Sequence, residues 1–197
     1  MTTTTAVGTA GRAGPRLAAM TDVAEACALP HPRLPMADLP PEVAAHAKAT
    51  GTTAFLGQFG HAPGLIEGWL AWYRPLMLGG QVPTRTKELC RLAVASRTGC
   101  HMCQNGRFPD PSGTGAAVPE DDAEAVLAGR FDGFSPAEQA ALAYTVAYYA
   151  DHMTIPDEAI ERACAELGND GFLELALMVA QFTGMGRLFS ALGITAG

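Results

Sequence analysis

The most chemically distinctive feature of the sequence is a pair of cysteines three positions apart. Cys100 and Cys103 enclose His101 and Met102. If Cys103 lies in the first turn of a helix, the two sulfur atoms can approach disulfide distance. The spacing therefore predicts reversible thiol–disulfide chemistry at Cys100 and Cys103.

The charges near this pair favour the thiolate form. Residues 84–107 contain five basic side chains and one acidic side chain, a local charge of +4 in a chain whose net charge is −7. The start of a helix after Gly99 would add partial positive charge. Both effects should lower the pKa of a nearby thiol. The basic residues are Arg85, Lys87, Arg91, Arg97 and Arg107, and the acidic residue is Glu88.

Zinc binding is the main alternative use of two cysteines at this spacing. A structural zinc ion needs four ligands, which a second such pair or a paired histidine motif usually supplies. The sequence has neither, and Cys27, Cys90 and Cys164 are scattered along the chain. Redox chemistry is thus favoured over a metal site, and a purely structural role for both thiols is a weaker alternative. We also find no haem or nucleotide-binding motif, so no cofactor is expected.

The composition restricts the partners of this protein. The 197 residues are 48% hydrophobic and 17% charged. The charged fraction is below the roughly 25% of an ordinary soluble domain, which predicts apolar surface hidden in a subunit interface. The net negative charge argues against nucleic acid, and the apolar stretches fall short of the ~20 residues that span a bilayer. Small molecules or proteins are the expected partners.

The chain is predicted to be a single all-α domain of about seven to eight helices, residues 39–197, preceded by a flexible tail over residues 1–38. The first thirty residues lack the apolar core of a secretory signal, so a cytoplasmic location with reduced thiols is expected. Capping residues, prolines and glycines delimit the helices. We expect the longer ones at 41–49, 63–78, 84–98, 136–153, 157–168 and 170–192, and shorter ones near 55–59 and after 119.

Apolar periodicity predicts which helix faces are buried. In the helix beginning at Pro63, five large residues recur at helical spacing and indicate one buried face, better explained as core or interface than as a ligand site. The segment 84–98 is expected to be amphipathic, with its basic residues largely away from the buried side. The last helix carries a row of residues typical of buried packing. The five residues are Leu65, Trp69, Trp72, Tyr73 and Leu76, and the row is Met178, Phe182, Met185 and Phe189.

A larger pattern surrounds the cysteines. Residues 87–103 combine a glutamate, an apolar helix and the paired cysteines, and residues 186–193 read Gly-Arg-Leu-Phe-Ser-Ala-Leu-Gly. Over about residues 40–195 the chain resembles the carboxymuconolactone decarboxylase / alkylhydroperoxidase D-like superfamily. The resemblance implies an alkylhydroperoxidase D-like helical bundle that self-associates, as a trimer or as a hexamer built from two trimers.

The resemblance also implies roles for individual residues. In the redox branch of this superfamily the residue at the position of Cys103 attacks a peroxide, and the one at Cys100 then forms the disulfide. Glu88 would serve a proton relay. A separate protein or small-thiol reductant must restore the dithiol. The implied activity is that of an alkylhydroperoxidase-like thiol oxidoreductase, a peroxidase or a disulfide reductase.

Two features depart from this pattern or complicate it. The relay histidine expected four residues after the second cysteine is Arg107 here. Arginine cannot shuttle protons, but it can hold a thiolate or an anionic substrate, and His101 is a candidate replacement for the relay. Twelve residues of straight helix span about 18 Å, so Glu88 reaches Cys100 only if the chain folds back at Gly99 or a neighbouring subunit contributes. Alternatively, Glu88 is an ordinary surface partner of Arg91 or Lys87.

Two other functions remain open from the sequence. One is a lactone decarboxylase or related proton-transfer enzyme in which Arg107 binds the anion, although that branch generally lacks both cysteines. The other is a tailoring enzyme of a specialised pathway, or a non-catalytic helical assembly protein. The reactivity of Cys100 and Cys103 distinguishes these functions from thiol redox catalysis.

Overall fold

A computed structural model describes residues 32–194 of the chain, and within this range the protein is all-α. It has eight helices and no strand, and its one β-bridge joins Pro109 and Ala116 in a loop. The prediction of an all-α fold with seven to eight helices is thus confirmed for this range. The helices are α2 (Pro41–Thr50), α3 (Thr53–Phe59), α4 (Pro63–Leu78), α5 (Thr84–Thr98), α6 (His101–Asn105), α7 (Glu120–Leu127), α8 (Pro136–Asp151) and α9 (Asp157–Leu192).

Local sequence signals set most helix ends. Helix α2 begins with a proline and ends at Gly51, whose φ of 66° is left-handed. At the start of α8, Ser135 and Glu138 form a complete capping box, with each side chain bonded to the backbone of the other residue. The two helices expected at 157–168 and 170–192 join as α9, which is interrupted by a non-helical φ of 72° at Gly168. These boundaries follow from capping chemistry and glycine conformation rather than from packing.

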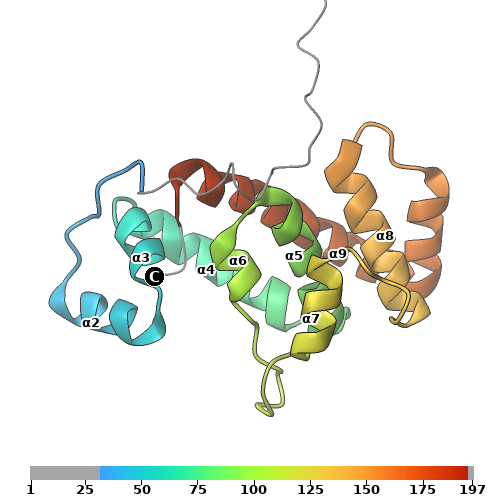
Figure 1. The fold of residues 1–197 in the computed structure, drawn as a ribbon, viewed down its shortest axis with the longest axis horizontal. Coiled ribbons are helices and arrows are strands. Elements are labelled where there is room, and N and C mark those ends of the chain that lie inside the picture. The colour runs from blue at the N-terminus through green and yellow to red at the C-terminus, as the bar shows by residue number, and fades with distance from the viewer. Residues whose placement is uncertain (1–31, 195–197) are drawn as a thin grey trace, which may run out of the picture.

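Helix α5 is the centre of the fold. It packs against α9, α8, α7 and α6, and α4 touches one end of the group (Figure 1). Lys87 and Glu88 have no exposed surface and Arg91 retains 3%. The predicted amphipathic character of this helix is therefore wrong, because most of its residues are buried by neighbouring helices and three of its charged residues, Lys87, Glu88 and Arg91, are paired inside the protein.

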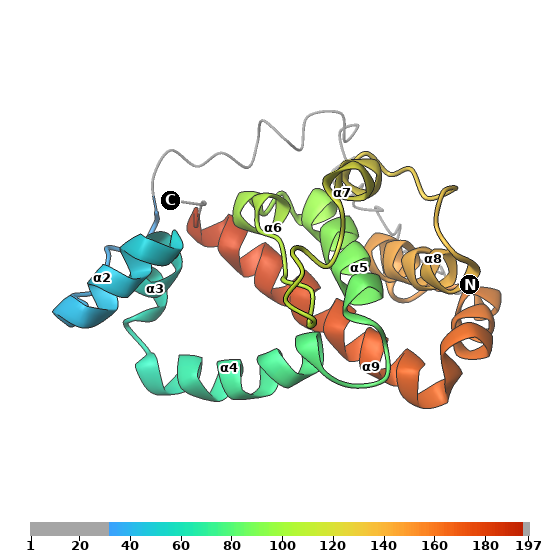
Figure 2. The same cartoon turned by 90° about the horizontal axis from the view of Figure 1, so that it is seen from below.

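Helices α2 and α3 form an arm at the opposite end of the molecule from α8 (Figures 1 and 2), and α4 continues from this arm along the lower edge of the view in Figure 2. Helix α4 touches only α5 and α9 to any extent. Consequently Leu65 and Trp72 are 77% and 46% exposed, against the prediction of one buried face. Trp69, Tyr73 and Leu76 are half-buried on the side that faces the body.

A buried lysine fastens the end of α4. Lys87 donates hydrogen bonds to the backbone carbonyls of Leu76, at 2.7 Å, and Gly79, at 2.5 Å, and it also forms an ion pair with Glu174 of α9. Glu174 in turn accepts a bond from the backbone N–H of Gln81 at 2.8 Å. The ammonium group satisfies carbonyls that a helix end leaves unpaired, and thereby joins α4, α5 and α9.

Helix α9 is long and apolar enough, by length and composition alone, to cross a membrane. Helices from the core of soluble proteins have the same property. Leu175, Met178, Val179 and Phe182 of α9 are buried in the main hydrophobic core with α5 and α8. The apolar character of this part of α9 is explained by that core.

Most of the predicted tail, residues 1–31, lies outside the described residues. The part within the described range is bonded to the body. The N–H of Arg33 donates to the carbonyl of Leu192 at 2.9 Å, and that of Ala37 donates to Gly57 at 2.7 Å. Gln58, which is buried, donates to the carbonyl of Leu34 at 2.7 Å. These bonds attach residues 33–37 to α3 and to the end of α9.

Candidate active site: a disulfide beside an apolar cavity

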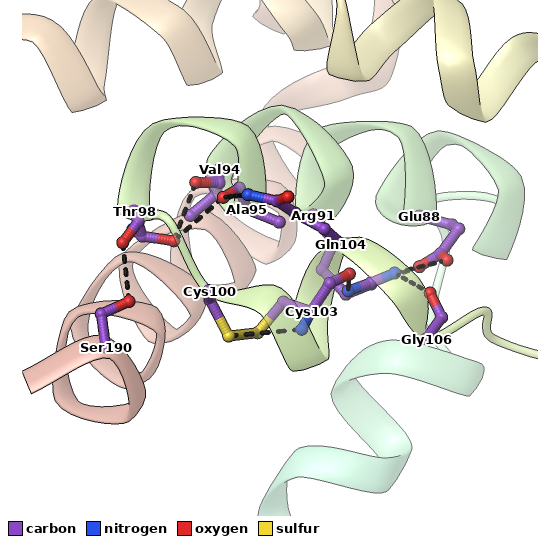
Figure 3. The surroundings of a disulfide bond; sticks show 10 residues. All are labelled: Glu88, Arg91, Val94, Ala95, Thr98, Cys100, Cys103, Gln104, Gly106 and Ser190. Carbon is purple, nitrogen blue, oxygen red and sulfur yellow. Dashed lines mark hydrogen bonds and ion pairs between the residues drawn. A yellow bond between two sulfur atoms is a disulfide. The ribbon is translucent and has the colours of Figure 1, made fainter. Parts of the chain in front are cut away.

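Cys100 and Cys103 are joined by a disulfide at the start of α6 (Figure 3). Gly99 ends α5 in a left-handed conformation, with φ of 64°, and turns the chain so that α6 packs back on α5. Cys100 is the N-cap of α6 and Cys103 lies in its first turn, which places their Cα atoms 5.2 Å apart. The expectation that the two sulfurs can meet is confirmed, and the turn at Gly99 is what permits it.

The two sulfurs differ in their surroundings. Both cysteines pack in a small buried cluster with Ala95, Phe189 and Ile194, but only Cys103 also lines a cavity of about 340 Å³. The exposed fractions of Cys103 and Cys100 are 8% and 1%. The N–H of Cys103 also donates to Sγ of Cys100 at 3.3 Å. A reagent inside the cavity would therefore reach Cys103 first, and Cys100 is the sulfur that the backbone stabilises.

A buried ion pair connects α5 to this turn. Arg91 binds both oxygens of Glu88, at 2.6 and 2.7 Å, and donates to the carbonyls of Cys103, at 2.5 Å, and Gly106, at 2.8 Å (Figure 3). Glu88 also accepts the backbone N–H of Phe108 at 3.2 Å. The chain thus folds back at Gly99 within one subunit, and Arg91 is the link between Glu88 and the cysteine loop.

This geometry changes the interpretation of Glu88. Arg91 is its partner, as the surface alternative proposed, but the pair is buried rather than on the surface. Among the described residues, the hydrogen-bond partners of the Glu88 carboxylate are Arg91 and Phe108, not a cysteine sulfur.

The local positive charge expected from the sequence is largely neutralised. Four of the five basic residues in 84–107 form ion pairs, and three of these four residues use acidic partners from α7, α8 or α9. A count along the sequence misses those partners because they lie beyond the segment. The pairs are Arg85 with Asp122 and Glu138, Lys87 with Glu174, Arg91 with Glu88, and Arg107 with Glu120.

Arg107 lines the cavity, but its guanidinium group is held. Nη2 and Nε contact the two oxygens of Glu120 at 2.6 and 3.1 Å, and Nη1 donates to the carbonyls of Gln104 and Gly106 at 2.5 and 2.9 Å. The hydrogen bonds from Arg107 lower the pKa of the Glu120 carboxyl below its usual value. An anion bound at Arg107 would have to compete with Glu120.

His101 opens α6 and is half-buried. It is absent from the described residues that line the cavity. The structure therefore brings Cys103, Arg91 and Arg107 together at the cavity, with Glu88 behind Arg91 and Cys100 behind Cys103. His101 lies outside this group.

The cavity wall is rich in aromatic residues, and the sequence did not predict this cavity. Trp69 and Tyr73 of α4 face three residues that were predicted to be buried packing in the last helix. Helical periodicity marks an apolar face but does not distinguish a filled core from a cavity, so no signal in these helices identified the site. The three residues are Phe182, Met185 and Phe189.

Tyr73 is the titratable phenol of this wall. Its ring stacks on Trp69, with centroids 4.6 Å apart, and burial raises the pKa of its hydroxyl. The charge of Arg91 lowers this pKa and that of Glu88 raises it, both to a smaller extent than burial. Trp69 is itself fixed by a 3.2 Å bond from Nε1 to Gln181.

The other cysteines lie away from the cavity. Cys90 is fully buried, and burial raises the pKa of its thiol to about 12. Cys164 is half-buried and free, and Cys27 lies outside the described residues. Within residues 32–194 no three histidine, cysteine or acidic side chains are grouped so as to hold a metal ion.

Comparison with solved structures identifies the fold as alkylhydroperoxidase D-like. One similar structure is an uncharacterized peroxidase-related protein from Silicibacter sp. TM1040, with a TM-score of 0.65 and 20% identity over 84% of this chain and 90% of that one. Another is described as the alkylhydroperoxidase AhpD core, an uncharacterized peroxidase-related protein from Ralstonia eutropha JMP134, with a TM-score of 0.66 and 16% identity over 84% and 92%. The sequence matches no protein-family model and no curated protein. The chain thus has the fold that its sequence resemblance implies.

Proposed function

We propose that this protein is a thiol-dependent oxidoreductase of the peroxidase type that cycles Cys100 and Cys103 between dithiol and disulfide. The observation that carries the proposal is the arrangement of the two sulfurs, with Cys103 at an apolar cavity and Cys100 buried behind it. The likeness to peroxidase-related proteins supports the same class of activity at low sequence identity.

The proposed cycle begins at Cys103. Its thiolate attacks the terminal oxygen of a hydroperoxide, the S–O bond forms, the O–O bond breaks, and the sulfur becomes a sulfenic acid. The other oxygen leaves as an alkoxide, or as hydroxide when the oxidant is hydrogen peroxide, and takes up a proton. The Cys100 thiol then displaces hydroxide from that sulfur, giving the disulfide and water. Because the Cys103 N–H already donates to Cys100 Sγ, it also stabilises the Cys100 thiolate that attacks in this step.

The return step runs in the opposite direction. A reductant thiolate attacks the accessible sulfur, Cys103, and Cys100 leaves as the thiolate. A second thiol of the reductant then frees Cys103. The electron donor must carry thiols, and either a small dithiol or a thiol-bearing protein would supply them. The cycle needs no bound cofactor or metal.

The walls of the cavity favour an organic hydroperoxide over hydrogen peroxide. Phe55, Phe182, Met185 and Phe189 offer apolar contact beside Cys103. Burying an apolar group there would contribute roughly 25 cal/mol per Å² of apolar surface. Hydrogen peroxide has no such group, so the two oxidants should differ mainly in how tightly they bind.

Glu88 and Arg91 fit a positioning role. Arg91 fixes the carbonyl of Cys103, and Glu88 fixes Arg91. In this proposal Glu88 acts on the cysteine through Arg91, in place of the proton relay that the family resemblance implies. Arg107 remains a candidate for substrate binding at the cavity, in competition with Glu120.

We also propose that the protein acts in the cytoplasm as a homo-oligomer. Exposed apolar or small residues recur every three or four positions along α9, which is the spacing of a helix–helix seam. Replacing Leu177 by Glu should reduce the molar mass measured by light scattering on gel filtration, and an unchanged mass would exclude this face. This exposed face of α9 consists of Leu173, Leu177, Ala180, Gly184, Leu188 and Ala191.

The test of the function follows the disulfide directly. The reduced protein is mixed with hydrogen peroxide or cumene hydroperoxide, and disulfide formation is timed by mass spectrometry. Cys103→Ser should abolish rapid oxidation, whereas Cys100→Ser should stop at a sulfenic acid that dimedone traps. Cys164→Ser is the matched control and should behave like the unmodified protein. Slow oxidation that both single variants share would refute the proposal and favour the lactone or proton-transfer alternative.

A further inference from the structure

The phenol of Tyr73 is held rigidly in the cavity wall. Besides its stack on Trp69, which is tilted by only 13°, the ring meets Phe108 and Phe182 edge-on, with centroids 5.9 and 5.6 Å away. These contacts come from α4, from the loop after α6 and from α9. A ring fixed from three elements presents its hydroxyl at one place.

This hydroxyl is available for a new partner. Among the described residues, none forms a hydrogen bond with the Tyr73 hydroxyl. Tyr73 lines the cavity, and its hydroxyl oxygen is not one of the fully enclosed polar atoms. It also interacts electrostatically with Arg91 and Glu88, the ion pair that holds Cys103. The phenol, the ion pair and Cys103 therefore share one site.

The proposed reaction needs a proton at this site. When the O–O bond of an alkyl hydroperoxide breaks, the leaving oxygen departs as an alkoxide, which is strongly basic. The family's relay histidine is replaced by Arg107, whose guanidinium is bound to Glu120 and cannot act as an acid at neutral pH. His101 lies off the cavity wall.

We propose that the Tyr73 hydroxyl is the proton donor of the oxidation step, an inference that rests on the proposed function. The Cys103 thiolate supplies the electron pair to the terminal oxygen, the O–O bond breaks, and the leaving alkoxide takes the proton of Tyr73 to become an alcohol. The tyrosinate then recovers a proton from water that enters the cavity. The charge of Arg91 favours the transient tyrosinate, whereas burial and the charge of Glu88 oppose it and drive its reprotonation.

The test compares oxidants whose leaving groups differ in basicity. An alkyl hydroperoxide such as tert-butyl hydroperoxide releases an alkoxide, whereas peracetic acid releases acetate, which needs no proton. Tyr73→Phe keeps the ring and its stacking but removes the hydroxyl. We expect the rate of Cys103 oxidation by tert-butyl hydroperoxide to fall roughly 100-fold, the lower end of the range for general acid catalysis. The rate with peracetic acid should change less than about threefold, because acetate leaves without a proton.

Two controls separate this role from a structural one. Tyr148→Phe removes a phenol from α8, which lines a different cavity, and should leave both rates unchanged. Alkylation of Cys103 by iodoacetamide, which releases iodide, should proceed equally in Tyr73→Phe and in the unmodified protein. An equal loss with both oxidants, or no loss with either, would overturn the assignment of Tyr73. Failure of the unmodified protein to form the disulfide rapidly would instead overturn the proposed function, and the inference with it.

Discussion

The ion pair between Glu88 and Arg91 offers a sharp test of how this site is built. Both side chains are buried, and Arg91 uses its remaining donors on the carbonyls of Cys103 and Gly106. Glu88→Gln keeps the size and shape of the side chain but removes its charge. The guanidinium then remains buried without a counterion, which typically costs 3–5 kcal/mol. Its contacts with two carbonyls and two aromatic rings place the expected loss at the lower end, about 3 kcal/mol.

The assay is urea unfolding of the oxidised protein, so that the disulfide is the same in every sample. In a separate thermal unfolding experiment on a domain of this size, the same loss of about 3 kcal/mol corresponds to a fall in melting temperature of roughly 6–12 °C. Glu120→Gln is the matched control, because it removes the partner of an arginine in the same site but at the exposed surface. We expect no measurable change in stability for Glu120→Gln.

The reasoning also predicts that the two charges can be removed together. The double variant Glu88→Leu with Arg91→Met should be more stable than Glu88→Gln alone, because no unpaired charge is left in the core. The double variant should nevertheless react more slowly with hydroperoxides than the unmodified protein, since the Cys103 carbonyl loses the hydrogen bond from Arg91. A loss of less than about 1 kcal/mol for Glu88→Gln would show that water or another group compensates Arg91, and would refute the account of the pair.

Three further predictions concern stability. Lys87→Met should cost about 3 kcal/mol in urea unfolding, because it leaves Glu174 and two helix-end carbonyls without their buried partner; a loss near zero would mean that α4 is held by other contacts. Gly186→Ala should cost about 1–3 kcal/mol, because the added Cβ would lie 2.7 Å from Oγ1 of Thr98. Gly184→Ala, whose added Cβ meets nothing within 4 Å, should instead stabilise the protein by about 0.5–1 kcal/mol, because alanine is the better helix former. Burial raises the pKa of the Glu138 carboxyl, but hydrogen bonds from Ser135 and Arg85 outweigh it, so that this pKa is lowered in the folded protein. The ionised carboxylate therefore contributes its full stabilisation above the pKa of the unfolded state, and this contribution is lost as the pH falls through the lower pKa of the folded state. Glu138→Gln should flatten the pH dependence of unfolding between about pH 5 and pH 3.

Two contacts hold the pair of cysteines between the core and the cavity. Ser190 of α9 donates to the carbonyl of Thr98 at 2.7 Å, which fixes the end of α5 just before the turn at Gly99. Arg91 fixes the other side of that turn at Cys103. The two cysteines are therefore held from α9 and from α5.

The sequence by itself determined the local features of this protein. Proline, glycine and the Ser135–Glu138 capping box specify helix ends through bonds within a few residues, so most boundaries were predictable. The meeting of Cys100 and Cys103 is equally local, since it needs only three residues and the turn at Gly99. Gly168 is also local, since its non-helical φ of 72° breaks α9 where the sequence predicted one helix to end and the next to begin.

Only the tertiary structure decided what surrounds these local features. The periodicity of one helix indicates how its apolar residues are spaced, but not that neighbouring helices enclose most residues of α5. That enclosure buries Glu88 and Arg91, and the acidic partners of Lys87 and Arg107 lie on α9 and α7, far along the chain. The cavity arises in the same way, because α4 and α9 bring aromatic rings together around Cys103 that neither helix contributes alone. Burial, charge pairing and access to a sulfur depend on contacts between distant segments, and the spacing of residues within one segment does not specify them.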